Sequence, residues 1–401
     1  MSATSKSRIY LVSSSWKSRV FTTGKHGQLF DGEMKYGFTN EMERSAHLEE
    51  IKRRPWIAAL APGDWGTKYG LGAVDYFVHG PSALNIMLGD RCNSECRMCW
   101  QALARAQTKQ GGNTKPWRQT WPDLEPKIIY ETLAKYPSVR SVELCSFGEP
   151  LLHPEIQSII PQIARDVGEN GVLHMVSNGS MLKRAEVLLH IPGNLTLSID
   201  GADKKTYESI RRGLSWDTLT GNLRWALQVR IPERLIGINF TIIKENLGSI
   251  EDIGRFAFDS GIDYITYLLG DNMKETLSPE SDVKHELDKI QSRISVVRQD
   301  YSSSMGVNDR TSPATSATPS LAEVEPLPFC LMPWKQIDID PRGRAHPCCR
   351  SYHTNLGAVS KAWHGKQMAE LRNQLRSGRL DSKQFKDCAK CGRLGAKVQV
   401  I

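Results

Sequence analysis

The chain has 401 residues, of which 40% are hydrophobic and 24% are charged. This is the composition of an ordinary globular protein, and it excludes wholesale disorder. No stretch reaches the roughly 18 consecutive apolar residues that a membrane-spanning helix needs, so we expect no membrane partner. The N-terminal segment is basic and serine-rich, as in some transit peptides, but it lacks the apolar core of a secretory signal, and we expect a cytoplasmic protein.

The net charge of +8 is unevenly distributed, because the basic surplus lies from Cys330 onward and the rest of the chain is close to neutral. A basic patch can attract an acidic peptide, a phosphorylated substrate or RNA. It is more often a solvated face, so we do not expect a nucleic-acid partner.

The first 80 residues are polar and contain one helical pattern, near residues 40–60. From residue 82 onward apolar strands alternate with amphipathic helices. The predicted strands are 82–88, 139–146, 172–176, 195–199, 235–243 and 264–269, and the predicted helices include 125–136, 154–167, 183–190 and 249–259. This alternation indicates βαβ units and a parallel sheet. Six such units fit either a partial barrel or an open, doubly wound sheet.

Polar residues gather where these predicted strands end, which in parallel α/β proteins is the ligand-binding edge. The strand LTLSID illustrates the pattern, with Thr196, Ser198 and Asp200 alternating with apolar residues. A strand buried on both faces should be apolar throughout. We therefore expect a cavity lined with hydrogen-bonding groups.

Beyond the last predicted strand lie a helical stretch at 274–298 and a Ser/Thr/Pro/Ala-rich run at 302–328, which is typical of a flexible linker. A small cysteine-bearing module follows. The expected organisation is an unassigned extension (1–80), a core domain (81–272), a helix and linker (273–328) and a C-terminal module (329–401).

Nine cysteines occur in the chain, several of them closely spaced. In a reducing compartment such spacing favours metal or cluster ligands over disulfides. Cys92, Cys96 and Cys99, in LGDRCNSECRMCW, follow C-x3-C-x2-C directly after the first predicted strand. Three thiolates on one loop can hold three irons of a [4Fe–4S] cluster and leave the fourth iron open. A zinc site lacking one ligand, or buried structural thiols, would also fit this spacing alone.

The arrangement of these cysteines and of four downstream segments resembles the radical S-adenosylmethionine (radical SAM) enzymes over roughly residues 82–270. The segments are SFGEPLLHPEI with Gly148, Glu149 and Pro150, VSNGSML with Ser177 and Asn178, LTLSIDGADKKTYESIRRG with Ser198, Asp200 and Arg211, and INFTIIKEN. One departure is Met98, where the family usually has an aromatic residue. A thioether can still pack on adenine.

The resemblance implies an α/β fold, a partial (β/α)6 TIM-like barrel. It further implies that the GEP element engages the methionyl amino group of S-adenosylmethionine. Ser198 and Asp200 would face polar atoms of this ligand, and Arg211 would neutralise its carboxylate. An electron donor such as flavodoxin or ferredoxin would reduce the cluster, and cleavage of S-adenosylmethionine would give a 5′-deoxyadenosyl radical.

The C-terminal module, FCLMPWKQIDIDPRGRAHPCCR followed later by KDCAKCGR, resembles the SPASM/twitch extension of the same family. Since no cysteine follows Cys391 in this sequence, the resemblance implies the shorter twitch form. It would hold one auxiliary [4Fe–4S] cluster on Cys330, Cys348, Cys388 and Cys391. Cys349 is an alternative to Cys348, and a four-cysteine zinc ribbon is the alternative to a cluster.

Cys145 lies outside both sets, at the end of the second predicted strand. It is either a buried small hydrophobic residue or a hydrogen-atom donor to a substrate radical.

The expected function is abstraction of hydrogen from an unactivated C–H of a natural-product substrate, with net oxidation assisted by the auxiliary cluster. The substrate would be a small molecule such as a sugar or aminocyclitol, or a ribosomal peptide. The alternatives are an epimerase using Cys145, an RNA-modifying enzyme and a non-catalytic iron–sulfur sensor.

Overall fold

The computed structural model describes residues 8–12, 21–23, 29–31, 80–99, 121–169, 171–269, 330, 332–391 and 399–400. The helices predicted at 40–60 and 274–298 and the linker predicted at 302–328 lie outside these residues. Among the described residues, no helix has the length and apolar content needed to cross a membrane.

The central feature is a nine-stranded sheet with the order β1-β11-β10-β8-β7-β6-β4-β12-β13. Its six core strands are β4 (Ala83–Met87), β6 (Ser141–Cys145), β7 (Val172–Ser177), β8 (Gly193–Ser198), β10 (Arg234–Ile242) and β11 (Tyr264–Leu269). Neighbouring core strands are parallel and follow chain order. This order confirms the predicted partial (β/α)6 barrel. It excludes an open, doubly wound sheet, in which the strand order would reverse.

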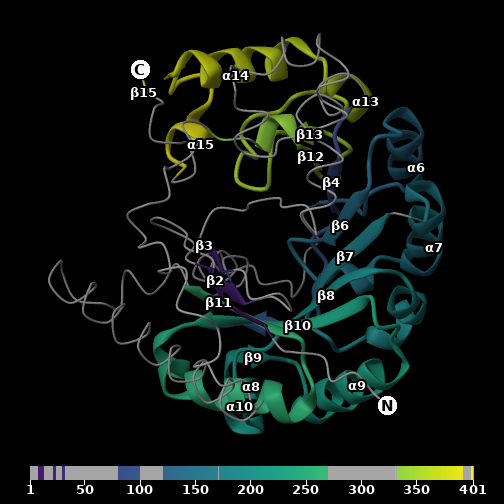
Figure 1. Cartoon of the computed structure of the whole chain (residues 1–401), viewed down its shortest axis with the longest axis vertical. Coiled ribbons are helices and arrows are strands. Elements are labelled where there is room, and N and C mark those ends of the chain that lie inside the picture. The colour runs from purple at the N-terminus through teal and green to yellow at the C-terminus, as the bar shows by residue number, and fades with distance from the viewer. Residues whose placement is uncertain are drawn as a thin grey trace, which may run out of the picture.

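Helices cover the outer face of the curved sheet (Figure 1). They are α6 (Pro126–Lys135), α7 (Ile156–Val167), the 3₁₀ helix η2 (Leu182–His190), α8 (Lys204–Ile210), α9 (Trp216–Val229), the 3₁₀ helix η3 (Lys244–Ser249) and α10 (Ile250–Ser260). Two of the starts have side-chain caps, since Asp203 accepts a hydrogen bond from Thr206 N and Ser215 accepts one from Thr218 N. These helices connect successive strands, and they lie on the same outer side of the sheet.

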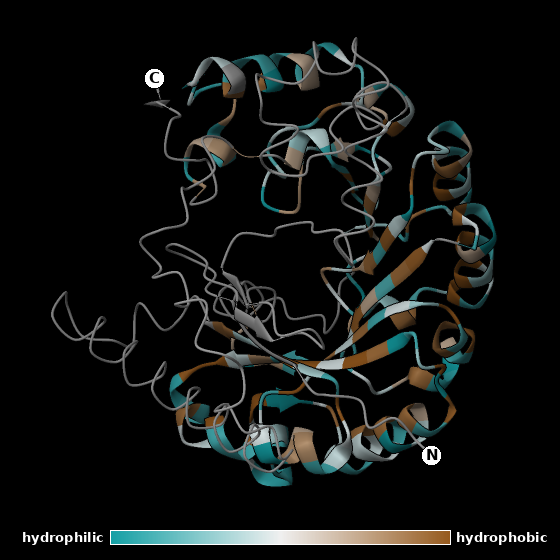
Figure 2. Cartoon of the chain, viewed as in Figure 1, coloured by the Kyte–Doolittle hydropathy of each residue, from teal (hydrophilic) through white to brown (hydrophobic). Residues whose placement is uncertain are grey.

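The two faces of the barrel wall differ in polarity. In β6, Val142 and Leu144 are fully buried toward the helices, where isoleucines of α7 meet them in the main core. Ser141, Glu143 and Cys145 alternate with them and keep partial exposure. Apolar strand residues are visible as brown bands interrupted by polar ones (Figure 2). The predicted polar inner face is thus present.

The C-terminal cysteine module is built onto the same sheet. Its strand β12 (Gln336–Ile339) pairs in parallel with β4, and β13 (Ala345–His346) pairs antiparallel with β12. Ser82 N and Ala83 N both donate to the Lys335 carbonyl at 3.0 and 3.2 Å, which begins the pairing. The remaining elements are η4 (Met332–Trp334), α13 (Val359–Ala362), α14 (Lys366–Ser377), β14 (Arg379–Leu380), α15 (Lys386–Ala389) and β15 (Gln399–Val400).

The module also shares the main hydrophobic core. Ile337 and Ile339 are fully buried in it, as is Trp363 beyond α13. A smaller cluster of Leu371, Leu375, Leu380 and Phe385 lies farther out. The sequence predicted a distinct module, but its first strand extends the barrel sheet, because an open barrel leaves an edge strand to which a further strand can bond.

Candidate functional site

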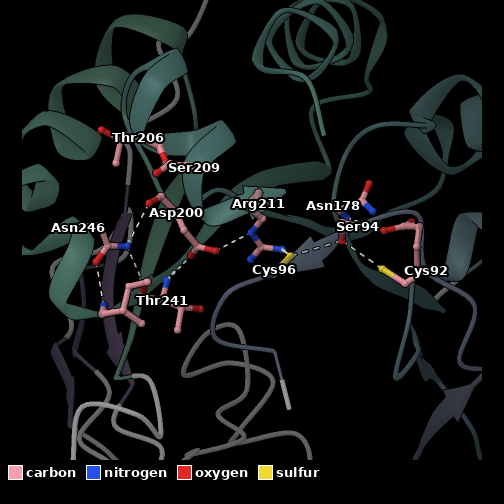
Figure 3. Close-up of polar contacts among 12 residues, drawn as sticks. Cys92, Ser94, Cys96, Asn178, Asp200, Thr206, Ser209, Arg211, Thr241 and Asn246 are labelled. Carbon is pink, nitrogen blue, oxygen red and sulfur yellow. Dashed lines mark hydrogen bonds and ion pairs between the residues drawn. The ribbon is translucent and has the colours of Figure 1, made fainter. Parts of the chain in front are cut away.

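The three cysteines of the first set lie on one loop at the carboxyl end of β4. The short strand β5 (Glu95–Cys96) pairs antiparallel with β9 (Arg211–Arg212), which anchors the middle of the loop. Ser94 Oγ lies 3.2 Å from Cys92 Sγ and 3.3 Å from Cys96 Sγ (Figure 3). The Cys99 amide donates to the Cys96 carbonyl at 3.1 Å. Ser94 therefore holds the Cys92 and Cys96 thiols on either side of its hydroxyl, and Cys99 is tied to the same compact loop through its backbone.

Glu149 of the GEP element is buried and joins the ends of β6 and β7. Its carboxylate accepts hydrogen bonds from Ser177 Oγ at 2.8 Å, from Asn178 N at 2.6 Å and from Leu151 N at 3.1 Å. Burial raises the pKa of Glu149, and these hydrogen bonds oppose the rise. The glutamate thus serves as an internal anchor, and Pro150 begins the 3₁₀ helix η1 (Pro150–Leu152) behind it.

The same element contacts the cysteine loop directly. Glu149 N donates to the Arg91 carbonyl at 2.6 Å. A β-carbon placed on Gly148 would lie only 1.8 Å from the Arg91 carbonyl oxygen, so only glycine permits this approach. Asn178 Nδ2 donates to Asn93 Oδ1 at 2.8 Å, which ties the end of β7 to the same loop. Asn93 was not predicted as a site residue. Its position between the predicted ligands Cys92 and Cys96 is the only sequence feature that could have indicated it.

Asp200 and Arg211 form a buried ion pair, in which Arg211 Nε lies 2.5 Å from Asp200 Oδ2. The Arg211 side chain is 12% exposed and the Asp200 side chain is 0% exposed. The other carboxylate oxygen accepts a hydrogen bond from Thr241 N at 2.6 Å. Arg211 Nη1 reaches Cys96 Sγ at 3.7 Å (Figure 3). The sequence predicted that Asp200 faces the ligand, whereas its carboxylate is occupied by Arg211 and Thr241. Asp200 therefore positions Arg211, and Ser198 keeps partial exposure on the inner face.

These residues fit an iron–sulfur cluster with one open iron. Such clusters carry net negative charge when thiolates ligate them. Arg211 places a permanent positive charge beside Cys96. Three thiols with an adjacent guanidinium would stabilise the anionic cluster, and the guanidinium is also suited to a ligand carboxylate.

The second cysteine set lines one pocket between η4, the turn after β13 and α15. Cys330, Cys348, Cys388 and Cys391 all border it, together with the apolar residues Met332, Pro333, Pro347 and Leu375. Cys349 is exposed and does not border the pocket. Burial raises the pKa of Cys348 and of Cys388. The geometry therefore favours Cys348 over Cys349 as the fourth partner in an enclosed cluster site.

Cys145 lies in the barrel wall, where its Sγ donates to Asn85 Oδ1 at 2.8 Å. Burial raises the pKa of this thiol well above its ordinary value. It therefore stays protonated and retains the S–H bond that a hydrogen-atom donor needs.

Comparison with known protein families agrees with this geometry. Residues 86–257 match the Radical SAM superfamily, and residues 330–392 match the SPASM iron–sulfur cluster-binding domain. The chain therefore contains a radical SAM domain and a SPASM-type iron–sulfur domain. S-adenosylmethionine and [4Fe–4S] clusters are accordingly its cofactors.

Three curated relatives share part of the chain. A probable GTP 3′,8-cyclase of Sulfurisphaera tokodaii is 25% identical over 240 residues, which cover 57% of this chain and 72% of the relative. The tungsten-containing aldehyde ferredoxin oxidoreductase cofactor-modifying protein of Pyrococcus furiosus is 22% identical over 45% of this chain and 49% of its own length. A GTP 3′,8-cyclase of Microcystis aeruginosa is 27% identical over 44% of this chain and 52% of its own length.

Solved structures share the fold at lower identity. SuiB of Streptococcus suis, bound to S-adenosylmethionine, superposes with a TM-score of 0.53 and 15% identity over 99% of this chain and 94% of its own. The structure of anSMEcpe with bound AdoMet gives 0.52 and 13% identity over 78% of this chain and 83% of its own.

Gly148→Ala should disrupt the cysteine loop, because its β-carbon would collide with the Arg91 carbonyl. We expect a loss of about 2 kcal/mol or more in unfolding free energy and loss of iron from the first cluster. Thermal unfolding and iron analysis measure both. The control is Gly221→Ala in α9, where a β-carbon meets nothing within 4 Å. Equal effects of the two substitutions would contradict the close-approach argument.

Cys348→Ala and Cys349→Ala separate the two adjacent cysteines. Reconstituted wild-type protein should contain about eight irons per chain, four for each cubane cluster. Cys348→Ala should fall to about four, while Cys349→Ala should stay near eight, because only Cys348 borders the pocket. Iron and sulfide assays with Mössbauer spectra provide the count. Iron loss confined to Cys349→Ala would reverse the assignment.

Proposed function

We propose that this radical SAM enzyme abstracts hydrogen from an unactivated C–H of a natural-product substrate and that the overall reaction is an oxidation. The substrate would be a small molecule, such as a sugar or an aminocyclitol, or a ribosomal peptide. The observation that carries the proposal is the β12–β4 pairing, which joins the auxiliary cysteine pocket to the barrel whose mouth carries the radical-generating loop. The radical SAM barrel and the domain that carries the auxiliary cysteines therefore share one continuous sheet.

When bound, the first cluster supplies the electron that cleaves S-adenosylmethionine to methionine and a 5′-deoxyadenosyl radical, and the auxiliary cluster offers an acceptor for an electron leaving the substrate. The substrate gives one hydrogen atom to the radical and then loses one electron and one proton, so the oxidation balances. A one-electron carrier protein such as flavodoxin or ferredoxin would supply the electron that reduces the first cluster.

The protein residues orient and enclose these groups. Arg211, held by Asp200, would bind the carboxylate of S-adenosylmethionine beside Cys96. Ser198 would offer a hydroxyl from the inner face of β8. Glu149 and Asn178 would act indirectly, since their hydrogen bonds hold the strand ends and the cysteine loop in one arrangement.

The relatives' names describe cyclisation of GTP and modification of a cofactor. We do not transfer those reactions to this chain, because the similarity covers 57% and 45% of it at 25% and 22% identity. A non-catalytic sensor would not need both the GEP element and the SIDG segment, which the resemblance assigns to binding of S-adenosylmethionine. An RNA-modifying role has only the C-terminal basic surplus in its favour and would require salt-dependent RNA binding.

Anaerobic incubation of the reconstituted protein with S-adenosylmethionine and dithionite tests the proposed radical chemistry. We expect 5′-deoxyadenosine, detected by liquid chromatography with mass spectrometry, from wild-type protein. Cys96→Ala should produce none, while Cys349→Ala should produce it at the wild-type level. A fully reconstituted wild-type sample that forms no 5′-deoxyadenosine would contradict the enzyme proposal.

A second candidate function is epimerisation with Cys145 as hydrogen donor, favoured by its protonated thiol on the inner face of β6. In deuterated water, Cys145→Ala should then stop deuterium incorporation into product without stopping 5′-deoxyadenosine formation. Cys145→Ser is the matched control for structure, because a hydroxyl can keep the hydrogen bond to Asn85. Unchanged turnover and stereochemistry in Cys145→Ala would remove this candidate.

A further inference from the structure

One row of polar side chains crosses four adjacent strands of the barrel wall. Asp338 of β12 is in register with Asn85 of β4, Asn85 with Glu143 of β6, and Glu143 with His174 of β7. In-register residues of parallel strands point to the same face of a sheet. The row therefore runs from the SPASM-type domain into the interior of the radical SAM barrel.

Most of this row is internally satisfied. Asp338 is fully buried and accepts hydrogen bonds from Asn85 Nδ2 at 2.7 Å and Gln336 Nε2 at 2.6 Å. Burial raises its pKa to about 8, so it carries a proton at neutral pH. His174 accepts a hydrogen bond from Asn194 N at 3.1 Å, and burial lowers its pKa to about 4, so it is uncharged. Neither residue brings a positive charge to the row.

Glu143 is the exception. Its side chain is half-buried, and within the described part of the chain it makes no hydrogen bond and no ion pair. Burial is the cause that raises its pKa. Unlike Asp338, it keeps partial exposure, which its place in the β6 alternation directs to the barrel interior. A half-buried carboxyl that has no partner among the described residues would be satisfied by a charged donor from a ligand.

The surroundings place this carboxyl on the side of the barrel that adjoins the SPASM-type domain. Cys145 lies on the same face of β6, and Asn85 bridges it to Asp338. Asp338 lies on β12, the strand of the SPASM-type domain that pairs with β4. The Tyr352 ring, which follows the auxiliary cysteines, contacts Phe147 beyond the end of β6 with ring centroids 5.2 Å apart. A molecule held at Glu143 would therefore lie inside the barrel, next to the domain that carries the auxiliary pocket.

We propose that Glu143 binds a protonated amino group of the substrate, so that the substrate class is a primary amine. This inference rests on the proposed function and narrows its substrate. An ammonium group donates three hydrogen bonds and carries the positive charge that the row lacks. A hydroxyl at the same position would leave the carboxylate charge unpaired, so the subsite discriminates between an amine and an alcohol of the same shape.

Isothermal titration calorimetry on anaerobic, reconstituted protein with S-adenosylmethionine tests this subsite with two pairs of probes. Cyclohexylamine and cyclohexanol represent an amino-substituted ring and its neutral counterpart. Nα-acetyl-lysine methylamide and Nα-acetyl-norleucine methylamide represent a peptide side chain. We expect one amine to bind at least about tenfold more tightly than its neutral counterpart, the discrimination that a charged hydrogen bond supplies. The pair of probes that shows this preference indicates whether the substrate is a small molecule or a peptide.

Glu143→Gln should weaken binding of that amine by about tenfold to 100-fold, because the amide keeps the shape and removes the charge. The matched control is Glu131→Gln on α6, whose side chain is 64% exposed, and it should bind like wild type. Thermal unfolding of both variants checks folding, and Glu143→Gln should be at least as stable as wild type because it removes a half-buried carboxyl that has no partner among the described residues.

Three results would overturn the subsite: equal binding of amine and neutral probe, no amine binding up to about 10 mM, or unchanged amine binding by Glu143→Gln. Displacement of the amine by Mg²⁺ at equal concentration would also overturn it, since the site would then be a divalent-cation site. The same samples are assayed for 5′-deoxyadenosine. If wild-type protein forms 5′-deoxyadenosine but shows no preference for the amine, only the proposed subsite is wrong. If wild-type protein forms no 5′-deoxyadenosine, the proposed function itself is wrong.

Discussion

The backbone pairing of β12 with β4 is the constraint on which the rest of the arrangement depends. Partial barrels end in an edge strand with unpaired amides and carbonyls, and here the first strand of the SPASM-type domain satisfies that edge. Because the paired strands share one register, Asp338 is held beside Asn85, and Ile337 and Ile339 enter the main core. Two of the auxiliary cysteines, Cys330 and Cys348, flank β12 in the sequence, so their pocket is placed relative to the barrel by hydrogen bonds and apolar burial together.

Buried polar contacts provide the second level of organisation. Glu149 accepts three hydrogen bonds from the ends of neighbouring elements, and Asp200 holds Arg211 against the cysteine loop. Removing one partner of such a contact leaves a charge uncompensated inside the protein, which is far more costly than losing a surface pair. The loop that bears Cys92, Cys96 and Cys99 is therefore supported from behind by groups that are already satisfied. In contrast to these two buried carboxylates, Glu143 is half-buried on the inner face of β6 and has no hydrogen-bond or ion-pair partner among the described residues.

Much of the fold was accessible from residue patterns. The strand at Tyr264–Leu269 has the predicted bounds, and the other core strands differ from prediction by a few residues at their ends. These strands are short apolar runs between helical patterns, and their identity depends mainly on local chemistry. The cysteine loop was equally accessible, since its three ligand candidates lie within eight residues. Asp200 and Arg211 were both predicted as site residues, but their ion pair was not, because it forms only through the turn after α8.

The sequence by itself determined the strand–helix alternation, the polar inner face and the two cysteine sets, because each depends on residues that are close along the chain. Tertiary structure alone decided that β12 joins the barrel, that Cys348 rather than Cys349 borders the auxiliary pocket, and that Glu143 lies in register with Asp338. Those three outcomes depend on contacts between segments about 200 residues apart or on which side of a turn faces inward. Strand register and enclosure set them, and neither leaves a signal in local composition.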